Sequence, residues 1–216
     1  MPIGIVKPGG FWNCGEKPPQ CRERREGRRE DENAARIYFT ECFSPGVGCI
    51  NIRNMLIGIV SDTHDKTHPL IAALRQLRSR GAEYFIHCGD VGGEHVLDQF
   101  AGLPVSFIWG NNDWDVAGLE DYAKRLGLSC GGRLAEFDLG GKSFAVTHGD
   151  QPSIQRKILE AQQTDYLLQG HTHVFSDTRV GRTRVINPGA LYRAQFKTVA
   201  LLDTAADRLD RIVVGT

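Results

Sequence analysis

Apolar runs and amphipathic stretches alternate along the chain from Met55 onward. Three apolar runs end abruptly in polar residues, as buried strands of a parallel sheet do: LIGIVSD, AEYFIHCGD and VSFIWGNND. Apolar residues between these runs recur at helical spacing, for example Leu70, Leu74 and Leu77. The pattern therefore predicts three helices, over residues 67–80, 93–100 and 116–126.

The second half of the chain has a different order of elements. RLAEFDLGGKSFAVTHGD predicts a hairpin that turns at Gly140 and Gly141, and a helix is expected over 153–162. DYLLQGHTH predicts another strand, and short strands are expected around 174–180, 183–186, 198–203 and 208–214. Parallel β-α units followed by meander-like strands indicate a mixed α/β sandwich rather than a purely doubly wound sheet.

Residues 1–54 differ from the rest in composition. They hold five of the nine prolines and the mixed-charge run RERREGRREDEN, which has no apolar periodicity. We therefore expect a disordered or dispensable extension, or an over-long start assignment, followed by one domain over 55–216. Four cysteines of this segment form two C-x6-C spacings, longer than those of zinc knuckles, so zinc binding there is the weaker hypothesis. Cys88 and Cys130 are expected to pack as small apolar residues.

The balance of charge argues against some classes of partner. The 216 residues carry 26 basic and 26 acidic side chains, so the formal net charge is zero, which argues against electrostatic binding of nucleic acid. No apolar run approaches the roughly 18 residues that span a bilayer. The first residues lack the basic and apolar regions of a signal peptide. We expect a cytoplasmic protein with no membrane partner.

Strand after strand ends in residues that could bind a ligand: IVSDTH, IHCGD, IWGNND, AVTHGD, LLQGHTH and VINPGA. In open α/β folds, ligands gather outside the carboxyl ends of strands, so these six ends are expected to meet at one edge. A lone histidine in a turn is usually a surface residue, but chance is a poor explanation for the whole ordered set. The candidate metal ligands are Asp62, His64, Asp90, Asn111, His148, His171 and His173.

This set of donors suits two divalent ions better than one. Four imidazoles, two carboxylates and one amide oxygen are too many for a tetrahedral zinc ion. Asp62 and His64 are two residues apart, so both reach one ion only if the chain bends there. Two carboxylates leave about two positive charges of the ions uncompensated, which a bridging hydroxide and a phosphate oxygen would balance. The residues thus predict phosphoester hydrolysis by a hydroxide that bridges two metals.

The motifs, in order, resemble those of the calcineurin-like metallophosphoesterase family. The family pattern is D-x-H, G-D, G-N-H-[D/E], a lone H and G-H-x-H, and here it reads SDTH, GD, GNND, THG and GHTH, followed by INPGA. The resemblance runs from Met55 to the C-terminus and is strongest to the small single-domain YfcE-type phosphodiesterases. It implies a four-layer αββα sandwich and two metal ions, usually Mn²⁺, with Fe, Zn and Ni also found in the family.

The same resemblance implies a division of the ligands. A first metal would be bound by Asp62, His64 and His173, and a second by Asn111, His148 and His171, with Asp90 bridging the two. Asp90, His148 and Asn112 are the residues expected to act in catalysis.

One position departs from the family pattern. The histidine of G-N-H-[D/E], which lies near the leaving group, is Asn112 here. Asparagine cannot transfer a proton, although its amide can donate a hydrogen bond to a phosphoryl oxygen. We therefore expect a preference for phosphoesters whose leaving group departs without protonation, such as aryl esters.

Other functions stay open beside the leading one, a phosphodiesterase acting on a small phosphoester. A phosphomonoesterase or nucleotidase would use the same ligands. A non-catalytic protein-interaction scaffold is the alternative of another class, because one eukaryotic trafficking subunit uses this fold mainly for assembly. All seven candidate ligands are present, which favours the enzyme. Formation of a homo-oligomer is left open.

Several residues near the motifs have structural interpretations. His87 is expected to pack or to brace a ligand, and Asp113 either forms the turn or orients a ligand. Trp109, Trp114 and Phe175 either line a substrate pocket or have no role in the site.

Overall fold

The computed structural model describes residues 35–36 and 55–215 of the chain. The predictions for residues 1–54, including the zinc hypothesis for their cysteines, therefore lie outside the described residues, apart from the short strand β1 (Ala35–Arg36). The helices lie where the sequence predicts them: α1 (Thr67–Ser79), α2 (Glu94–Asp98), α3 (Val116–Arg125) and α4 (Pro152–Ala161). In the described part of the chain, every helix is too short or too polar to cross a membrane.

The first ligand-bearing strands belong to one mixed sheet. Its strand order is β12-β11-β2-β3-β4-β5. β2 to β5 are parallel, as the repeated β-α pattern predicts, whereas β11 and β12 run antiparallel to their neighbours. The strands are β2 (Leu56–Val60), β3 (Tyr84–His87), β4 (Val105–Phe107), β5 (Ser129–Cys130), β11 (Thr198–Asp203) and β12 (Arg208–Val213).

The second sheet carries the remaining ligand-bearing strands, in the order β1-β6-β7-β8-β10-β9. β6 and β7 form the predicted hairpin, and Gly140 and Gly141 turn it with φ of 58° and 72°. β7, β8 and β10 are parallel to one another. The strands are β6 (Leu134–Leu139), β7 (Lys142–Thr147), β8 (Tyr166–Leu168), β9 (Ser176–Val180) and β10 (Thr183–Asn187).

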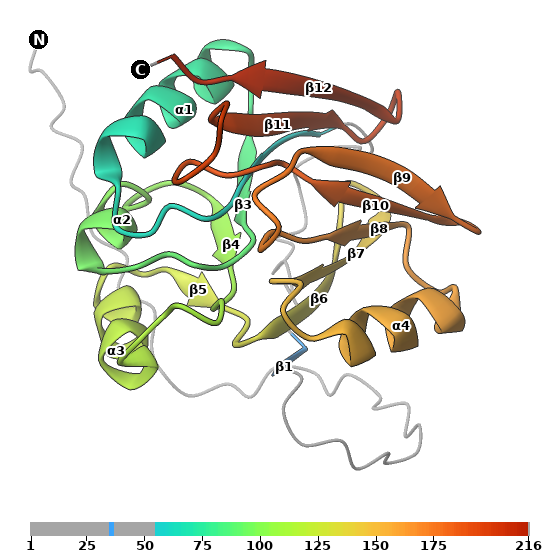
Figure 1. Cartoon of the computed structure of the whole chain (residues 1–216), viewed down its shortest axis with the longest axis horizontal. Helices are drawn as coiled ribbons and strands as arrows, with labels where there is room; N and C mark the ends of the chain where they lie inside the picture. Colours follow the sequence, from blue (N-terminus) through green and yellow to red (C-terminus); the bar gives the residue numbers. More distant parts are fainter. Residues whose placement is uncertain (1–34, 37–54, 216) are drawn as a thin grey trace, which may run out of the picture. The chain divides into compact units, whose positions relative to one another are not determined.

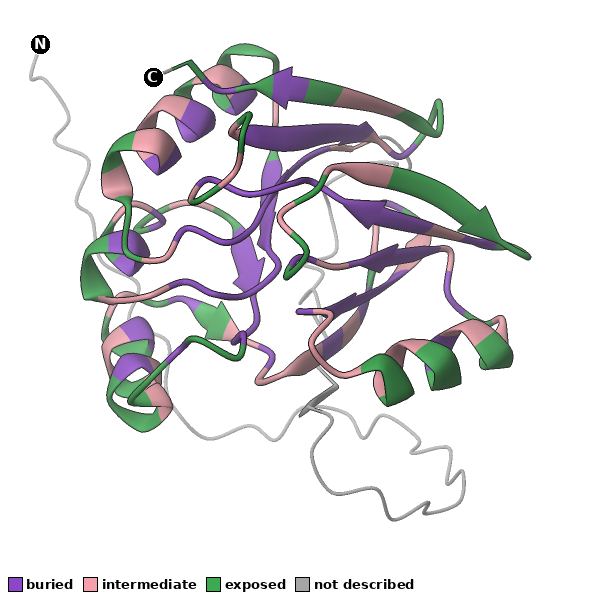
Figure 2. Ribbon diagram, viewed as in Figure 1, coloured by how far each residue is buried: buried purple, intermediate pink, exposed green. Residues whose placement is uncertain are grey.

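The two sheets pack face to face between helices. Figure 1 shows α1, α2 and α3 beside the sheet of β2 to β5, and α4 beside the sheet of β6 to β8. The strands between them are mostly buried, whereas each helix exposes one side (Figure 2). Strand β2 shows how the layers form, because Ile57 and Ile59 pack between the sheets while Val60 packs on the helix side. The predicted αββα sandwich is confirmed.

The prediction of a single sheet edge for all the ligand-bearing strand ends is wrong. β2, β3 and β4 belong to one sheet and β7, β8 and β10 to the other. Their following loops still meet, because the backbone N–H of His171 donates to Oδ2 of Asp62 at 3.2 Å and Nδ1 of His148 donates to the carbonyl of Cys88 at 2.8 Å. An apolar run shows that a strand is buried but not which sheet it joins. The carboxyl ends of two parallel sets thus converge on one place.

Candidate metal centre

Five of the seven candidate ligands bring their donor atoms together. Oδ1 of Asp62 lies 3.1 Å from Nε2 of His173 and 3.9 Å from Nε2 of His64 and of His148. Oδ2 of Asp90 lies 3.2 Å from Nε2 of His148 and 3.4 Å from Nε2 of His64. The donor atoms form two groups of metal-ligand size, Asp62 with His64 and His173, and Asp62 with Asp90 and His148.

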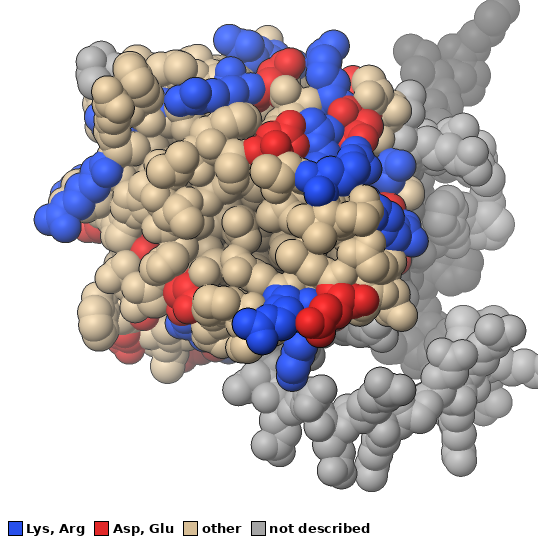
Figure 3. Space-filling view, turned by 45° about the vertical axis from the view of Figure 1, so that its right-hand side comes forward, with Lys and Arg blue, Asp and Glu red and all other residues tan. Residues whose placement is uncertain are grey.

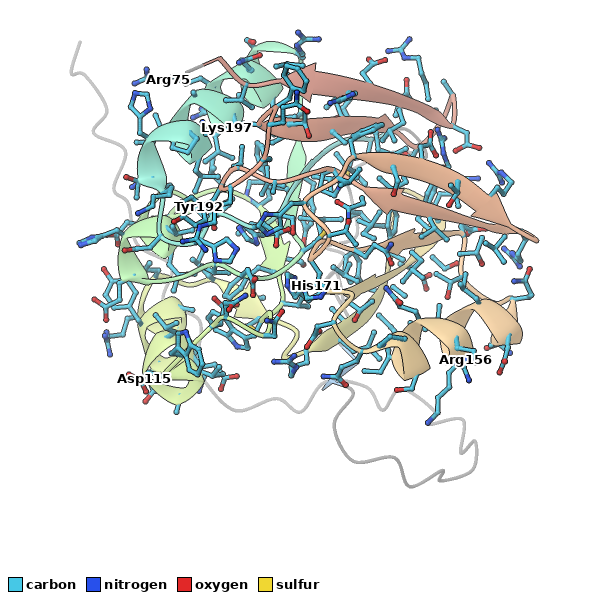
Figure 4. All side chains as sticks on the ribbon, viewed as in Figure 1. Arg75, Asp115, Arg156, His171, Tyr192 and Lys197 are labelled. Carbon is cyan, nitrogen blue, oxygen red and sulfur yellow. The ribbon has the colours of Figure 1, made fainter. Side chains whose placement is uncertain are left out.

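The other two candidate ligands lie beside this cluster rather than inside it. The ring of His171 contacts the ring of His148, with 5.2 Å between their centroids. Nδ1 of His171 lies 3.1 Å from Oδ1 of Asn111, and both side chains are exposed. Figure 4 shows His171 on the loop after β8, where it faces the loops of the first sheet. The two residues are placed at the open side of the cluster.

The backbone bends sharply at most of these residues. Five candidate ligands adopt the left-handed conformation, which non-glycine residues rarely do. Their φ angles are 54° at Asp62, 44° at His64, 55° at Asp90, 68° at His171 and 59° at His173. The expected bend between Asp62 and His64 is therefore present, and it lets both side chains approach one point.

Two glycines of the motifs permit close approach of the ligand loops. A Cβ atom on Gly110 would lie 2.1 Å from Oδ1 of Asp90, and one on Gly170 would lie 2.0 Å from Oγ of Ser61. Neither distance is possible for a larger residue without moving the loops. Gly110 thus lets neighbouring loops of one sheet come together, and Gly170 lets a loop of the second sheet approach the loop after β2 of the first.

The donor set fits metal ions. The two carboxylates are buried, Asp62 at 0% and Asp90 at 1% exposure, and only histidines make ion-pair contacts with them in the described residues. Oδ1 of Asp62 and Nε2 of His148 have no hydrogen-bond partner within the same part of the chain. Buried charges of one sign are unfavourable unless a cation compensates them. Divalent ions between these atoms would satisfy both.

The orientation of His148 is fixed from behind. Its Nδ1–H donates a hydrogen bond of 2.8 Å to the carbonyl of Cys88, so the neutral ring directs the lone pair of Nε2 at the two carboxylates. Metal-ligating histidines are commonly held in this way. Burial lowers the pKa of His148, but the nearby Asp90 and Asp62 carboxylates outweigh it and raise the pKa above its ordinary value. The two carboxylates therefore favour a cation bound to Nε2, whether a proton or a metal ion.

Asn112 binds the carboxylate expected to bridge the metals. Its backbone N–H donates to Oδ1 of Asp90 and its side-chain Nδ2 to Oδ2, both at 2.8 Å. Burial raises the pKa of Asp90, but the close approach of the His148 ring and the hydrogen bonds from Asn112 outweigh it and lower the pKa well below its usual range. The sequence suggested that the side-chain amide of Asn112 donates a hydrogen bond to a phosphoryl oxygen. In the structure it donates to Asp90 and holds that carboxylate in place.

His87 braces the loops behind the site. The backbone N–H of Gly89 donates to its Nδ1 at 3.2 Å, so Nε2 carries the proton of the neutral ring and donates to Oγ1 of Thr63 at 3.0 Å. Thr63 in turn donates to the carbonyl of Val91 at 2.8 Å. Complete burial lowers the pKa of His87 to about 4, which keeps the ring neutral. Its donors and acceptors are used within the structure, so it is not a ligand.

Asp113 and Asn187 hold the ligand loops to one another. The carboxylate of Asp113 accepts hydrogen bonds from the backbone N–H groups of Gly92 at 2.8 Å and Gly110 at 2.7 Å, so it ties the loops after β3 and β4. Asn187 donates through Nδ2 to the carbonyl of Gly170 at 2.7 Å. Both residues position ligand-bearing backbone.

The three aromatic candidates differ in environment. Trp109 is buried in the core on the helix side, where its ring makes an edge contact with Phe107. Phe175 packs partly buried against the core between the sheets. Trp114 is 77% exposed. Of the three, Trp109 is therefore excluded from a substrate pocket.

Arg133 is a positioning residue that the sequence motifs did not reveal. Its Nη1 donates to the carbonyl of Gly110 at 3.1 Å, and Nη2 forms an ion pair with Asp150. Gly110 immediately precedes Asn111, and Asp150 lies two residues after His148. One guanidinium therefore connects the two loops that carry these candidate ligands of the second metal. No spacing along the chain relates residue 133 to the motifs, so only the folded structure shows this contact.

We expect Arg133→Ala to weaken binding of the second metal ion selectively. Loss of groups that orient metal ligands typically lowers metal affinity by about 10–100-fold. Calorimetric titration of the metal-free protein with Mn²⁺ should show the weaker binding step shifted by roughly tenfold, with the tighter step unchanged. The matched control is Arg182→Ala, which removes another Arg–Asp pair, with Asp165, and should change neither step. Equal shifts of both steps would contradict this role.

Comparison with known proteins agrees with this geometry. The calcineurin-like phosphoesterase superfamily domain matches residues 55–207. A phosphodiesterase of Methanocaldococcus jannaschii is 30% identical over 167 residues, which are 74% of this chain and 99% of the relative. A probable metallophosphoesterase of Methanothermobacter thermautotrophicus is 27% identical over 173 residues, covering 75% of this chain and 93% of the relative.

A solved archaeal phosphodiesterase has a similar structure, with a TM-score of 0.69 and 28% identity over 74% of this chain and 99% of that one. The matched domain begins at Met55, where the apolar pattern starts, and it contains every strand end that carries a candidate ligand. The sequence match, the αββα sandwich and the clustered donors agree: the chain belongs to the calcineurin-like phosphoesterase superfamily.

Proposed function

We propose that the protein is a metal-dependent phosphodiesterase and that it works with two divalent ions, both Mn²⁺. The observation that supports this most directly is the pair of buried carboxylates, Asp62 and Asp90, surrounded by imidazole nitrogens. Among the described residues, Oδ1 of Asp62 and Nε2 of His148 have no hydrogen-bond partner. When bound, two divalent ions polarise a phosphoryl oxygen and lower the pKa of water, which is the chemistry that phosphoester hydrolysis requires.

The residues of this chain would divide that task. Asp62, His64 and His173 would hold the first ion, and Asn111, His148 and His171 the second. Asp90 contacts a histidine of each set, His64 at 3.4 Å and His148 at 3.2 Å, which supports a shared role. Asn112 keeps both oxygens of Asp90 oriented, and His171 is exposed, so a substrate would approach the cluster from its side.

The chemistry of the site supports a diester with a good leaving group. Asn112 has no proton to transfer, and each histidine of the cluster is a candidate ligand, so neither the asparagine nor these histidines are available to protonate a leaving group. Relatives named as phosphodiesterases support a diester over a monoester. Figure 3 shows acidic and basic side chains interspersed on one face, which supports a small substrate rather than nucleic acid.

Hydrolysis of a matched pair of aryl esters tests this function. With Mn²⁺, bis(4-nitrophenyl) phosphate should be cleaved with a higher kcat/KM than 4-nitrophenyl phosphate, and chelation should abolish turnover until Mn²⁺ is restored. A preference for the monoester would instead identify a phosphomonoesterase. Turnover that survives chelation would refute the metal centre. Less than one bound ion per chain with no turnover would indicate a scaffold.

A further inference from the structure

An aromatic ring lies directly against the candidate metal centre. Tyr192, on the loop between β10 and β11, places its ring 5.2 Å from the ring of His64, centroid to centroid, at a tilt of 50°. Figure 4 shows Tyr192 beside the loop that leads from β2 to α1. The ring is partly exposed, so it forms part of the surface that a substrate meets next to His64.

Two exposed cations approach this ring. Nζ of Lys66 lies 5.4 Å and Cζ of Arg193 lies 5.1 Å from the centroid of Tyr192. Neither forms an ion pair with any residue for which the structure gives a position. The neighbouring acid, Asp65, has its carboxylate against Gly93. Two positive charges therefore lie beside the candidate metal centre with no acidic partner among the residues that the structure describes.

The backbone of this loop is also constrained. Arg193 has φ of 47°, a left-handed conformation that is unfavourable for arginine and persists only where the surrounding structure imposes it. The bend follows Tyr192 directly, so ring and guanidinium are presented together. Lys66 comes from a different loop, two residues after His64. The three side chains therefore meet through the fold and not through their order in the sequence.

We propose that Lys66, Tyr192 and Arg193 form a subsite for a second phosphate group of the substrate, beyond the phosphodiester that is cleaved. This inference rests on the proposed function. Bound metal ions would compensate the charge of the scissile group, so further cations beside them would have an anion to bind only if the substrate carries another one. Arginine binds phosphate oxygens through two parallel N–H groups, and an aromatic face lowers the hydration of a cation that lies on it. The substrate class is a phosphodiester that bears an additional phosphate.

Two substrates that differ only in that phosphate provide the test. Thymidine 5′-(4-nitrophenyl phosphate) and its 3′-phosphate derivative have the same scissile bond and release the same 4-nitrophenolate. The wild-type protein with Mn²⁺ should prefer the 3′-phosphorylated substrate by about tenfold in kcat/KM, mainly through KM, as expected for two exposed charged contacts. A wild-type ratio near one overturns the subsite.

Variants of the two cations assign the preference to them. Lys66→Met and Arg193→Gln, which keep most of the side-chain volume, should each lower the ratio, and the double variant should bring it to about one. Lys66→Arg and Arg193→Lys should retain most of it. The matched control is Arg125→Gln at the far end of α3, where Arg125 also lies 5.1 Å from a tyrosine ring, that of Tyr122; it should keep the wild-type ratio. An unchanged ratio in the double variant overturns the assignment.

A binding measurement separates this inference from the proposed function. If neither nucleotide ester is hydrolysed, the phosphodiesterase proposal fails, but the subsite is still tested by calorimetry. Thymidine 3′,5′-bisphosphate should then bind about tenfold more tightly than thymidine 5′-monophosphate, and the double variant should bind the two equally. Equal affinities in the wild-type protein would refute the subsite.

Discussion

Asp90→Ala is expected to lower kcat/KM for an aryl phosphodiester by about 10³-fold and to reduce bound Mn²⁺ from two ions per chain to one or fewer. The magnitude is that of removing one preorganised charged group from a catalytic site. Asp90 is the carboxylate that contacts a histidine of each proposed ligand set, so its loss affects both ions. Steady-state kinetics and metal analysis of the dialysed protein measure the two effects. Asp121→Ala, an exposed acid on α3, is the control that should change neither.

Stability distinguishes a metal role of Asp90 from a structural one. Asp62 and Asp90 are buried carboxylates close to the same histidines, so in the metal-free protein they disfavour one another. The hydrogen bonds to Asp90 outweigh this repulsion, because the pKa of Asp90 is lowered, so the ionised carboxylate stabilises the metal-free fold. Asp90→Asn removes that charge at nearly constant volume, and we expect Tm of the metal-free variant to lie below that of the metal-free wild type. The rise in Tm on adding Mn²⁺ should become smaller, because ligand stabilisation follows affinity. A rise in Tm on adding Mn²⁺ that is as large in the variant as in the wild type would show that Asp90 serves folding and not metal binding.

Asn112→His is expected to raise activity on poor leaving groups relative to good ones by about 10²-fold, the lower range for general acid catalysis. An imidazole at this position could donate the proton that an alkoxide needs and a nitrophenolate does not. The gain should appear as a weaker dependence of log kcat/KM on the pKa of the leaving group across a series of aryl and alkyl diesters. The backbone N–H of residue 112 would still donate to Asp90 in the variant.

The matched variant Asn112→Ala separates protonation from loss of the contact with Asp90. Both variants lose the side-chain hydrogen bond from Nδ2 to Oδ2 of Asp90, so both should lose some activity on every substrate. Only the histidine variant should change the slope of the leaving-group series. If alanine and histidine gave the same slope, the explanation of substrate preference by Asn112 would be wrong.

The fold could be predicted from sequence where local patterns carry the information. The helical spacing of 67–80 and the paired glycines of the β6–β7 hairpin give elements within one or two residues of those observed. Strand β5 has two residues, Ser129 and Cys130, and is too short to produce a pattern. The division of the strands between two sheets depends on non-local pairing, so the strand ends were expected at one edge instead of two.

The site, like the fold, has features that the sequence predicts and features that only the folded structure shows. The candidate ligands stand at strand ends, where chain order alone suggests their convergence, and their binding of metal stays a prediction. Arg133 and the Tyr192 ring have no sequence relation to the motifs and become relevant only through contacts made on folding. Asn112 was singled out by its departure from the family pattern, but its contact with Asp90 required coordinates.

The left-handed backbone at five candidate ligands has a consequence for how this fold could diverge. Each such residue is held against its preference, at about 1–3 kcal/mol, and glycine would relieve that strain while abolishing the donor. The most stable sequence for these loops is therefore not the one that can bind metal. In a descendant that kept the fold only for assembly, selection for donors would cease. Glycine or asparagine, which tolerate the left-handed conformation, should then replace Asp62, His64, Asp90, His171 and His173 more often than other residues do. Random substitution without strain would show no such preference.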